Sequence, residues 1–195
     1  HIWQDRGGAN GGDDLRGILK DMELFTGKRL GGELDTQGLT AKNWRMVKGA
    51  LVKGRKKCPD LIDASSLVSD LRLIKSAAEV KCVRKAAELS DLALDAAIAM
   101  TGSGVDEGAI LAAMQGEIFA RGGDYAGNEF IIGSGEGALL CRYYSGRRTL
   151  ESRDQLTLEW AGSSARYHAA MMRTIVIGEP KKRHHALYEA SRDAL

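Results

Sequence analysis

The first 65 residues alternate short apolar stripes with polar turns. After the glycine-rich segment at residues 7–12, apolar side chains recur at helical spacing, at Leu15, Ile18, Leu19 and Met22. A second helical stripe follows Thr40 and comprises Trp44, Val47, Ala50 and Leu51. Short apolar runs at residues 29–34 and 61–62 alternate with these helices and predict strands. This alternation indicates parallel strands and is typical of the tail of an α/β layer.

Residues 76–121 predict two consecutive helices. Ser76 and Glu79 have the spacing of a capping box, in which each side chain bonds the other residue's main-chain N–H. The alanine-rich stretch that follows carries two apolar stripes and continues to Gly102, which predicts a long, largely buried helix. A second helix is predicted over residues 105–121 and ends at Gly122.

Three strands are predicted after these helices, at residues 130–132, 156–160 and 174–177. In the middle strand, Leu156, Leu158 and Trp160 share one face, while Thr157 and Glu159 share the other. The small and polar residues 161–165 predict an antiparallel hairpin between the second and third strands. Residues 66–195 are therefore predicted to form an α+β unit with two helices packed on an antiparallel sheet.

The charge balance and the cysteines limit the classes of partner. Lys and Arg total 28 and Asp and Glu total 26, a net charge of +2 that does not favour a nucleic-acid or anionic-membrane partner. There is no run of apolar residues long enough for a transmembrane helix. The three cysteines lack metal-ligand spacing and are typical of reduced thiols. We expect a cytoplasmic location and a small-molecule substrate.

Both ends of the sequence suggest a piece of a longer chain. The first residue is not Met, and the helical composition of residues 184–195 continues to Leu195 without a stop signal.

The segment at residues 154–178 resembles the creatinase, prolidase and methionine-aminopeptidase superfamily, which has the pita-bread fold. In the family pattern an Asp is followed five residues later by a metal-binding Asp, and eleven residues after that by a second. The positions that match this frame without gaps are Asp154, Glu159, Tyr167, Arg173, Thr174 and Gly178. Residues 71–79 also resemble the family's entry into its catalytic domain. The resemblance implies that residues 1–65 are the C-terminal part of the N-terminal α/β domain. It also implies that residues 66–195 are the first half of a pita-bread catalytic domain, with the family's remaining His and two Glu ligands beyond Leu195.

The sequence departs from the family pattern at both ligand positions. Glu159 stands at the first position, and Ala170, which has no donor atom, stands at the second. Because two neighbouring divalent ions need shared anionic oxygens, we expect no standard binuclear site and no cofactor. The alternative is a manganese, cobalt or zinc site that the second half of the domain completes. Within the superfamily the chain is most similar to the metal-free branch, which includes creatinase and ectoine hydrolases.

Two residues are candidates for the catalytic step. Glu159 is the candidate general base or nucleophile, although a lone strand carboxylate can also lie on a solvated face. His168 is the candidate for donating to the substrate or carrying a proton, although a lone His is more often structural or exposed.

Substrate binding is assigned to a basic and aromatic loop and to Tyr167. Arg142 is chosen to hold a substrate carboxylate, because a guanidinium offers two parallel donors, and Tyr143 lies beside it. The alternative for this loop is an ordinary solvated turn.

The function expected from this resemblance is hydrolysis of a C–N bond in a small, carboxylate-bearing metabolite, as in creatinase or ectoine hydrolase, without metal. The alternatives are an Xaa-Pro dipeptidase or aminopeptidase of the metallopeptidase type, and a pita-bread protein that binds without catalysis. Relatives in the superfamily are commonly homodimers, so a homodimer is expected. The chain alone is expected to be inactive, because half of the catalytic domain would be absent.

Overall fold

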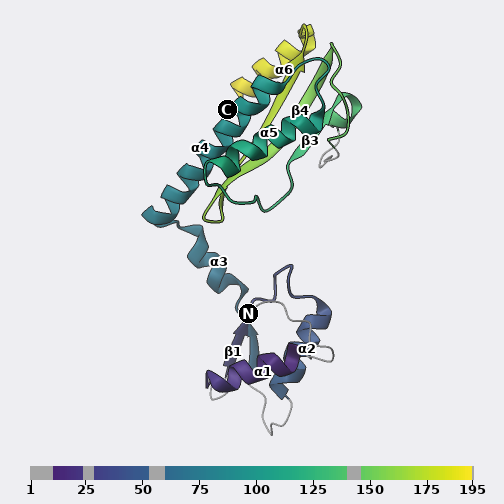
Figure 1. The fold of residues 1–195 in the computed structure, drawn as a ribbon. Coiled ribbons are helices and arrows are strands. Elements are labelled where there is room, and N and C mark those ends of the chain that lie inside the picture. The colour runs from purple at the N-terminus through teal and green to yellow at the C-terminus, as the bar shows by residue number, and fades with distance from the viewer. Residues whose placement is uncertain (1–10, 24–28, 53–59, 140–145, 195) are drawn as a thin grey trace. The chain divides into compact units, whose positions relative to one another are not determined.

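The computed structural model describes residues 11–23, 29–52, 60–139 and 146–194 (Figure 1). The chain divides into two compact units, His1–Ile74 and Lys75–Leu195. The boundary predicted from the sequence lies after residue 65. None of the described helices is both long enough and apolar enough to cross a bilayer.

The first unit contains a small parallel sheet with helices. Its elements are α1 (Gly11–Asp21), β1 (Arg29–Gly32), α2 (Ala41–Val52), β2 (Asp60–Asp63) and α3 (Ser65–Leu73). The strands β1 and β2 pair in parallel, as the alternation of helix and strand predicted. Helix α3 was not predicted, because it buries no side chain and lacks a side-chain N-cap that would have marked its start.

The second unit begins with the predicted long helix, α4 (Ala77–Met100). The capping box is confirmed: the Ser76 N–H donates to the Glu79 carboxylate at 2.7 Å, and Ser76 Oγ accepts from the Glu79 N–H at 3.3 Å. The Tyr167 hydroxyl also donates to the Glu79 carboxylate, at 2.8 Å. The start of α4 is therefore tied to a strand 88 residues further along the chain.

The second predicted helix, α5 (Glu107–Ala120), packs beside α4. The Asp106 carboxylate caps it by accepting from the Gly108 N–H at 2.8 Å. The helix ends before Gly122, whose φ of +78° is a conformation that glycine adopts without steric cost.

A three-stranded antiparallel sheet completes the second unit. Its strands are β3 (Ile131–Ser134), β4 (Asp154–Ser164) and β5 (Tyr167–Ile177), in the order β3-β4-β5. A short 3-10 turn, η1 (Gly135–Leu139), follows β3, and helix α6 (Lys182–Asp193) follows β5. The predicted hairpin between β4 and β5 is confirmed. Its turn is shorter than the predicted residues 161–165. Ala165 and Arg166 form the turn with positive φ values, and the small residues before them continue strand β4.

Helices α4 and α5 cover one face of this sheet (Figure 1). Leu156, Leu158 and Trp160 of β4 are buried in the core between the helices and the sheet. The buried apolar side chains of α4 and α5 that complete this core are Leu89, Ala93, Ala97, Ile110, Met114 and Ile118. Burial of this stripe places Glu159 on the opposite face of the sheet.

Helix α4 lies in close contact with the hairpin at Gly162. Ser90 Oγ accepts from the Gly162 N–H at 2.6 Å and donates to the Ala169 carbonyl at 2.6 Å. A methyl group added at Gly162 would lie 2.1 Å from the Ala86 carbonyl oxygen. Only glycine therefore allows this contact between helix and strand.

The Gly162→Ala substitution should therefore destabilise the protein. We expect the free energy of unfolding to fall by about 3 kcal/mol, because the helix and the strand must move apart. The control is Gly116→Ala in α5, where an added methyl group meets nothing within 4 Å. This control should raise stability by about 0.5–1 kcal/mol through helix propensity. Urea unfolding of both variants measures the difference, and equal stability of the two would contradict the packing described above.

The Glu79 carboxylate should make stability depend on acid pH. Hydrogen bonds from Ser76, and then from the Tyr167 hydroxyl, hold the pKa of Glu79 below its ordinary value of 4.5. A lowered pKa in the folded state adds stability above pH 4.5, and this stability is lost as the pH falls through the folded pKa. The difference in melting temperature between the wild type and Glu79→Gln should therefore shrink from about pH 6 to about pH 3. The control, Glu189→Gln at an exposed position of α6, should show a smaller change over this range.

Candidate active site

The face of the hairpin opposite α4 and α5 carries the predicted catalytic residues, and it is called the Glu159 face below. Strand alternation and the β4–β5 register assign ten side chains to it: Gln155, Thr157, Glu159, Ala161, Ser163, His168, Ala170, Met172, Thr174 and Val176. Glu159 is half-buried. Within the described residues its carboxylate makes no hydrogen bond or ion pair, so it can accept a proton or bind a ligand.

A cavity of about 680 Å³ lies against this face; Glu159 is not among its lining residues, but the neighbouring Thr157 and Met172 are. Its floor includes Thr157 of β4 and Met172 of β5, and Met172 is the register partner of Glu159. Helix α6 provides the opposite wall with His184, His185, Leu187 and Tyr188. The volume is in the range of sites that hold small ligands.

His168 lies on the Glu159 face but already has a structural contact. Its Nε2 accepts a hydrogen bond from the Gly127 N–H at 2.9 Å, so this nitrogen carries no proton. The same loop is held by the Asp124 N–H, which donates to the Ser163 carbonyl at 2.9 Å. The side chain of His168 is exposed. This geometry gives His168 a role in holding the 124–130 loop, and its catalytic role stays a prediction.

The predicted substrate-binding residues do not come together on this face within the described structure. Tyr167 belongs to the other set of β5 side chains, and its hydroxyl bonds Glu79 at the start of α4. Arg142 and Tyr143 lie outside the described residues. Substrate binding by these three residues therefore stays a prediction.

The second metal-ligand position of the family frame lies near Glu159. Ala170 pairs with Ala161, two positions from Glu159 along β4, so residues 159 and 170 are diagonal neighbours on one face. No donor side chain fills this second position. Among the described residues, no three His, Cys, Asp or Glu side chains are grouped so that they could hold a metal ion. The residues that the structure describes do not by themselves fit a metal site.

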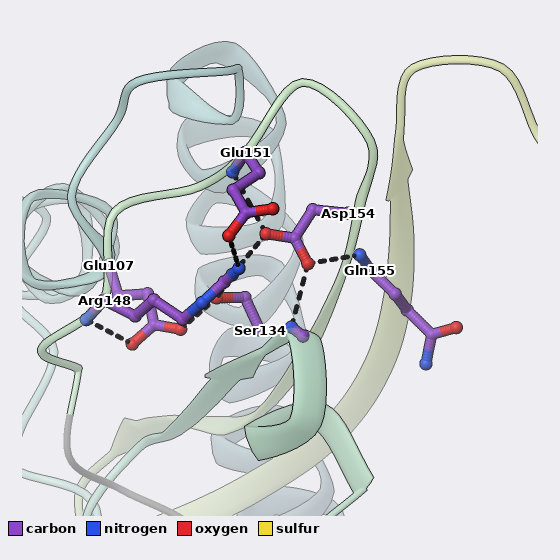
Figure 2. A network of polar contacts seen from close by, with 7 residues as sticks. Glu107, Ser134, Arg148, Glu151, Asp154 and Gln155 are labelled. Atoms are coloured by element: carbon purple, nitrogen blue, oxygen red, sulfur yellow. Dashed lines mark hydrogen bonds and ion pairs between the residues drawn. The ribbon is translucent and has the colours of Figure 1, made fainter.

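A polar network that the sequence analysis did not identify lies at the end of the sheet where β4 begins (Figure 2). The Arg148 guanidinium donates to the Asp154 carboxylate, to Ser134 Oγ at 2.7 Å and to the Glu151 carboxylate at 2.6 Å. The fully buried Glu107 carboxylate accepts from the Ser134 hydroxyl at 2.6 Å and from the Arg148 N–H at 3.1 Å. Glu107 lies in the first turn of α5, and its partners are 27 and 41 residues away in the chain.

The network changes the proton affinity of its charged groups. The hydrogen bond to Asp154 raises the pKa of Arg148 above its ordinary value. Burial acts to raise the pKa of Asp154, but hydrogen bonds from Arg148 and from the Glu151 and Gln155 N–H groups outweigh burial, so the pKa is lowered. Both groups therefore stay charged at neutral pH.

The network also reaches the edge of the Glu159 face through η1. The Asp154 carboxylate accepts from the Gly135 N–H at 2.9 Å, which holds the start of this turn. The Thr157 hydroxyl donates to the Ala138 carbonyl at 3.3 Å, which holds its other end. Thr157 is also part of the cavity floor, so the turn lies at the edge of the candidate site.

Comparison with protein families gives a match to the model described as metallopeptidase family M24, over residues 81–195. The chain is 26% identical over 187 residues to the uncharacterized peptidase YqhT of Bacillus subtilis, covering 95% of this chain and 50% of that protein. It is 29% identical over 177 residues to an Xaa-Pro dipeptidase of Pyrococcus furiosus, covering 91% of this chain and 47% of that protein.

The fold is similar to a solved Xaa-Pro dipeptidase from Bacillus anthracis, with a TM-score of 0.75 and 26% sequence identity. This match covers 94% of the chain and 48% of the dipeptidase, so the chain spans about half the length of the relatives it matches. The predicted α+β class and the partial pita-bread catalytic domain are confirmed. The prediction of no cofactor is wrong, because the matched family is described as a metallopeptidase family and the relatives include Xaa-Pro dipeptidases. That prediction relied on the missing donor at Ala170, and a single position of the chain could not exclude a metal.

The Ala170→Asp substitution should increase the affinity for divalent metal. A carboxylate at residue 170 would join Glu159 on the same face and supply a second anionic oxygen ligand. We expect manganese to bind the full-length protein about tenfold more tightly, a gain of about 1.4 kcal/mol. Calorimetric titration measures this affinity, and Ala112→Asp at an exposed position of α5 is the control. Equal affinity in the wild type and in Ala170→Asp would show that residue 170 does not face the metal.

Proposed function

The chain belongs to metallopeptidase family M24, and from that membership we propose that the protein hydrolyses C–N bonds, with Xaa-Pro dipeptides as the first substrate class to test. One observation supports the location of the reaction: the Glu159 carboxylate, which makes no hydrogen bond or ion pair among the described residues, lies on the face of the hairpin opposite α4 and α5, and its register partner Met172 lines the cavity. The relatives that are named Xaa-Pro dipeptidases support the substrate class.

Glu159 is proposed to accept a proton during hydrolysis. Attack of water on an amide carbonyl needs a group that removes a proton from the water, and a carboxylate near the reacting atoms can do this. Glu159 is half-buried, so part of its side chain is shielded from solvent. Its carboxylate has no competing hydrogen bond within the described structure, so it is available as a base.

His168 and the substrate-binding residues have secondary parts in this proposal. His168 can take part in proton transfer through its other ring nitrogen while Nε2 holds the Gly127 loop. Arg142 is proposed to hold the substrate carboxylate, with Tyr143 and Tyr167 completing the binding set. The hydroxyl of Tyr167 would have to leave Glu79 in order to reach a substrate.

A second candidate substrate is a small amide or amidine metabolite, such as creatine or ectoine. The observation that favours it is Ala170 beside Glu159, because this replaces a carboxylate with a methyl group and leaves space on the Glu159 face. Under this alternative the same face and the same Glu159 carboxylate would act on a non-peptide C–N bond. The homodimer and the cytoplasmic location stay predictions.

A substrate panel tests the proposed function. The full-length protein would be assayed with glycyl-proline, creatine and ectoine, after chelation and after addition of manganese, cobalt or zinc. Hydrolysis of the dipeptide, lost on chelation and restored by a metal, is the expected result. Hydrolysis of creatine or ectoine alone would support the second candidate. Binding of a ligand without turnover of any of the three would favour a non-catalytic protein.

The Glu159→Gln substitution should cut turnover while leaving the fold intact. Glutamine keeps the size of the side chain but removes the charge and the basicity, so kcat should fall by about 10²- to 10⁴-fold. Glu117→Gln is the matched control, because that residue pairs with Arg121 on the outer side of α5. Thermal unfolding should show that both variants fold. Near-normal turnover of Glu159→Gln would remove Glu159 from the site.

A further inference from the structure

Arg148 joins three segments of the second unit that are separate in the sequence. Its guanidinium contacts the end of β3 through Ser134 and the start of β4 through Asp154. Its main chain is bonded in both directions to the first residue of α5: the Arg148 N–H donates to the Glu107 carboxylate, and the Arg148 carbonyl accepts from the Glu107 N–H at 3.0 Å. Figure 2 shows Ser134, Glu151 and Asp154 around the guanidinium, and the Glu107 carboxylate at the Arg148 main-chain N–H.

Three of the partners of Arg148 are much more buried than Arg148 itself, whereas the fourth, Glu151, has a side chain that is 71% exposed. Glu107 is 0% exposed and Ser134 is 1% exposed, whereas the side chain of Asp154 is 3% exposed and that of Arg148 is 33% exposed. Removal of the guanidinium would leave the buried Asp154 carboxylate without its cation, which is costly. The partial exposure of Arg148 means that a small cation from solvent can reach the same position.

The guanidinium also lies next to the first residue of η1. Gly135, the first residue of this turn, has a φ of +56°, and a methyl group there would lie 3.1 Å from Arg148 Cζ. Asp154, which Arg148 holds, accepts from the Gly135 N–H. The far end of the turn is bonded to Thr157 on the cavity floor. A shift at Arg148 would therefore move the turn at the edge of the Glu159 face.

We propose that Arg148 is a positioning residue: through Asp154 it holds the Gly135–Leu139 turn against Thr157, and this placement sets how tightly the Glu159 face binds its substrate. The expected effect of Arg148 on substrate binding rests on the proposed function, whereas its expected effect on the turn is independent of that function. Arg148 is separated from Glu159 by several residues of β4 and does not touch the reacting atoms. Its loss should therefore weaken substrate binding more than it slows the chemical step.

The test compares Arg148→Ala and Arg148→Lys with Arg153→Ala, an exposed arginine of the same segment, in the full-length protein. For Arg148→Ala we expect KM to rise about tenfold and kcat to change less than about threefold. Arg148→Lys should be intermediate, because an ammonium can pair with Asp154 but cannot also reach Ser134 and Glu151 in the same fork. Guanidinium chloride at a low, non-denaturing concentration should lower the KM of Arg148→Ala and leave Arg153→Ala unchanged.

Hydrogen exchange of the peptide that covers residues 135–139 tests the same inference without substrate. Exchange should become faster in Arg148→Ala, return toward the wild-type rate with guanidinium, and stay unchanged in Arg153→Ala. Should Arg148→Ala not fold, Arg148→Lys gives the same comparison with a smaller expected change. Unchanged exchange, or an unchanged KM despite faster exchange, would overturn the proposal. If the wild type hydrolyses none of the three substrates, the proposed function fails, and the exchange rates alone decide whether Arg148 positions the turn.

Discussion

Burial of Leu156, Leu158 and Trp160 against α4 and α5 is the constraint on which the rest of the second unit depends. Side chains alternate along a strand, so this apolar stripe requires Thr157 and Glu159 to lie on the other face. The close contact at Gly162 and Ser90 then holds the hairpin against α4. The Tyr167 hydroxyl adds a second tie, to Glu79 at the start of that helix. Together these contacts leave one face of the hairpin uncovered by α4 and α5, and that face carries the candidate catalytic carboxylate.

The two ends of this face are held in different ways. Near the hairpin turn, main-chain bonds and the Nε2 of His168 hold the 124–130 loop in place. At the start of β4, a charged network built on Arg148 and Asp154 holds η1. The pKa of Arg148 is raised and the pKa of Asp154 is lowered, so both groups are charged at neutral pH. The network therefore contains an ion pair as well as neutral hydrogen bonds.

Local patterns predicted most of the elements, because their determinants are near neighbours in the chain. The capping box at Ser76 and Glu79, the apolar alternation of β4 and the hairpin could all be predicted in this way. The bonds from Glu107 to Ser134 and Arg148, and from His168 to Gly127, could not, because they join residues 27 to 41 positions apart. The face of the sheet on which the Tyr167 side chain lies depends on the register of this residue in β5. This could not be predicted, because the predicted third strand began only at residue 174. The metal prediction failed for a related reason: it relied on residue 170 alone, whereas the match to metallopeptidases extends over residues 81–195.

The central claim is that the Glu159 face of the hairpin is where substrate binds. A crystal structure of the full-length protein with bound proline, the carboxylate-bearing product expected from an Xaa-Pro dipeptide, tests this claim most directly. The account predicts the ligand in the cavity over Thr157 and Met172, within hydrogen-bond reach of the Glu159 carboxylate. A ligand bound on another surface, with the Glu159 face empty, would contradict it.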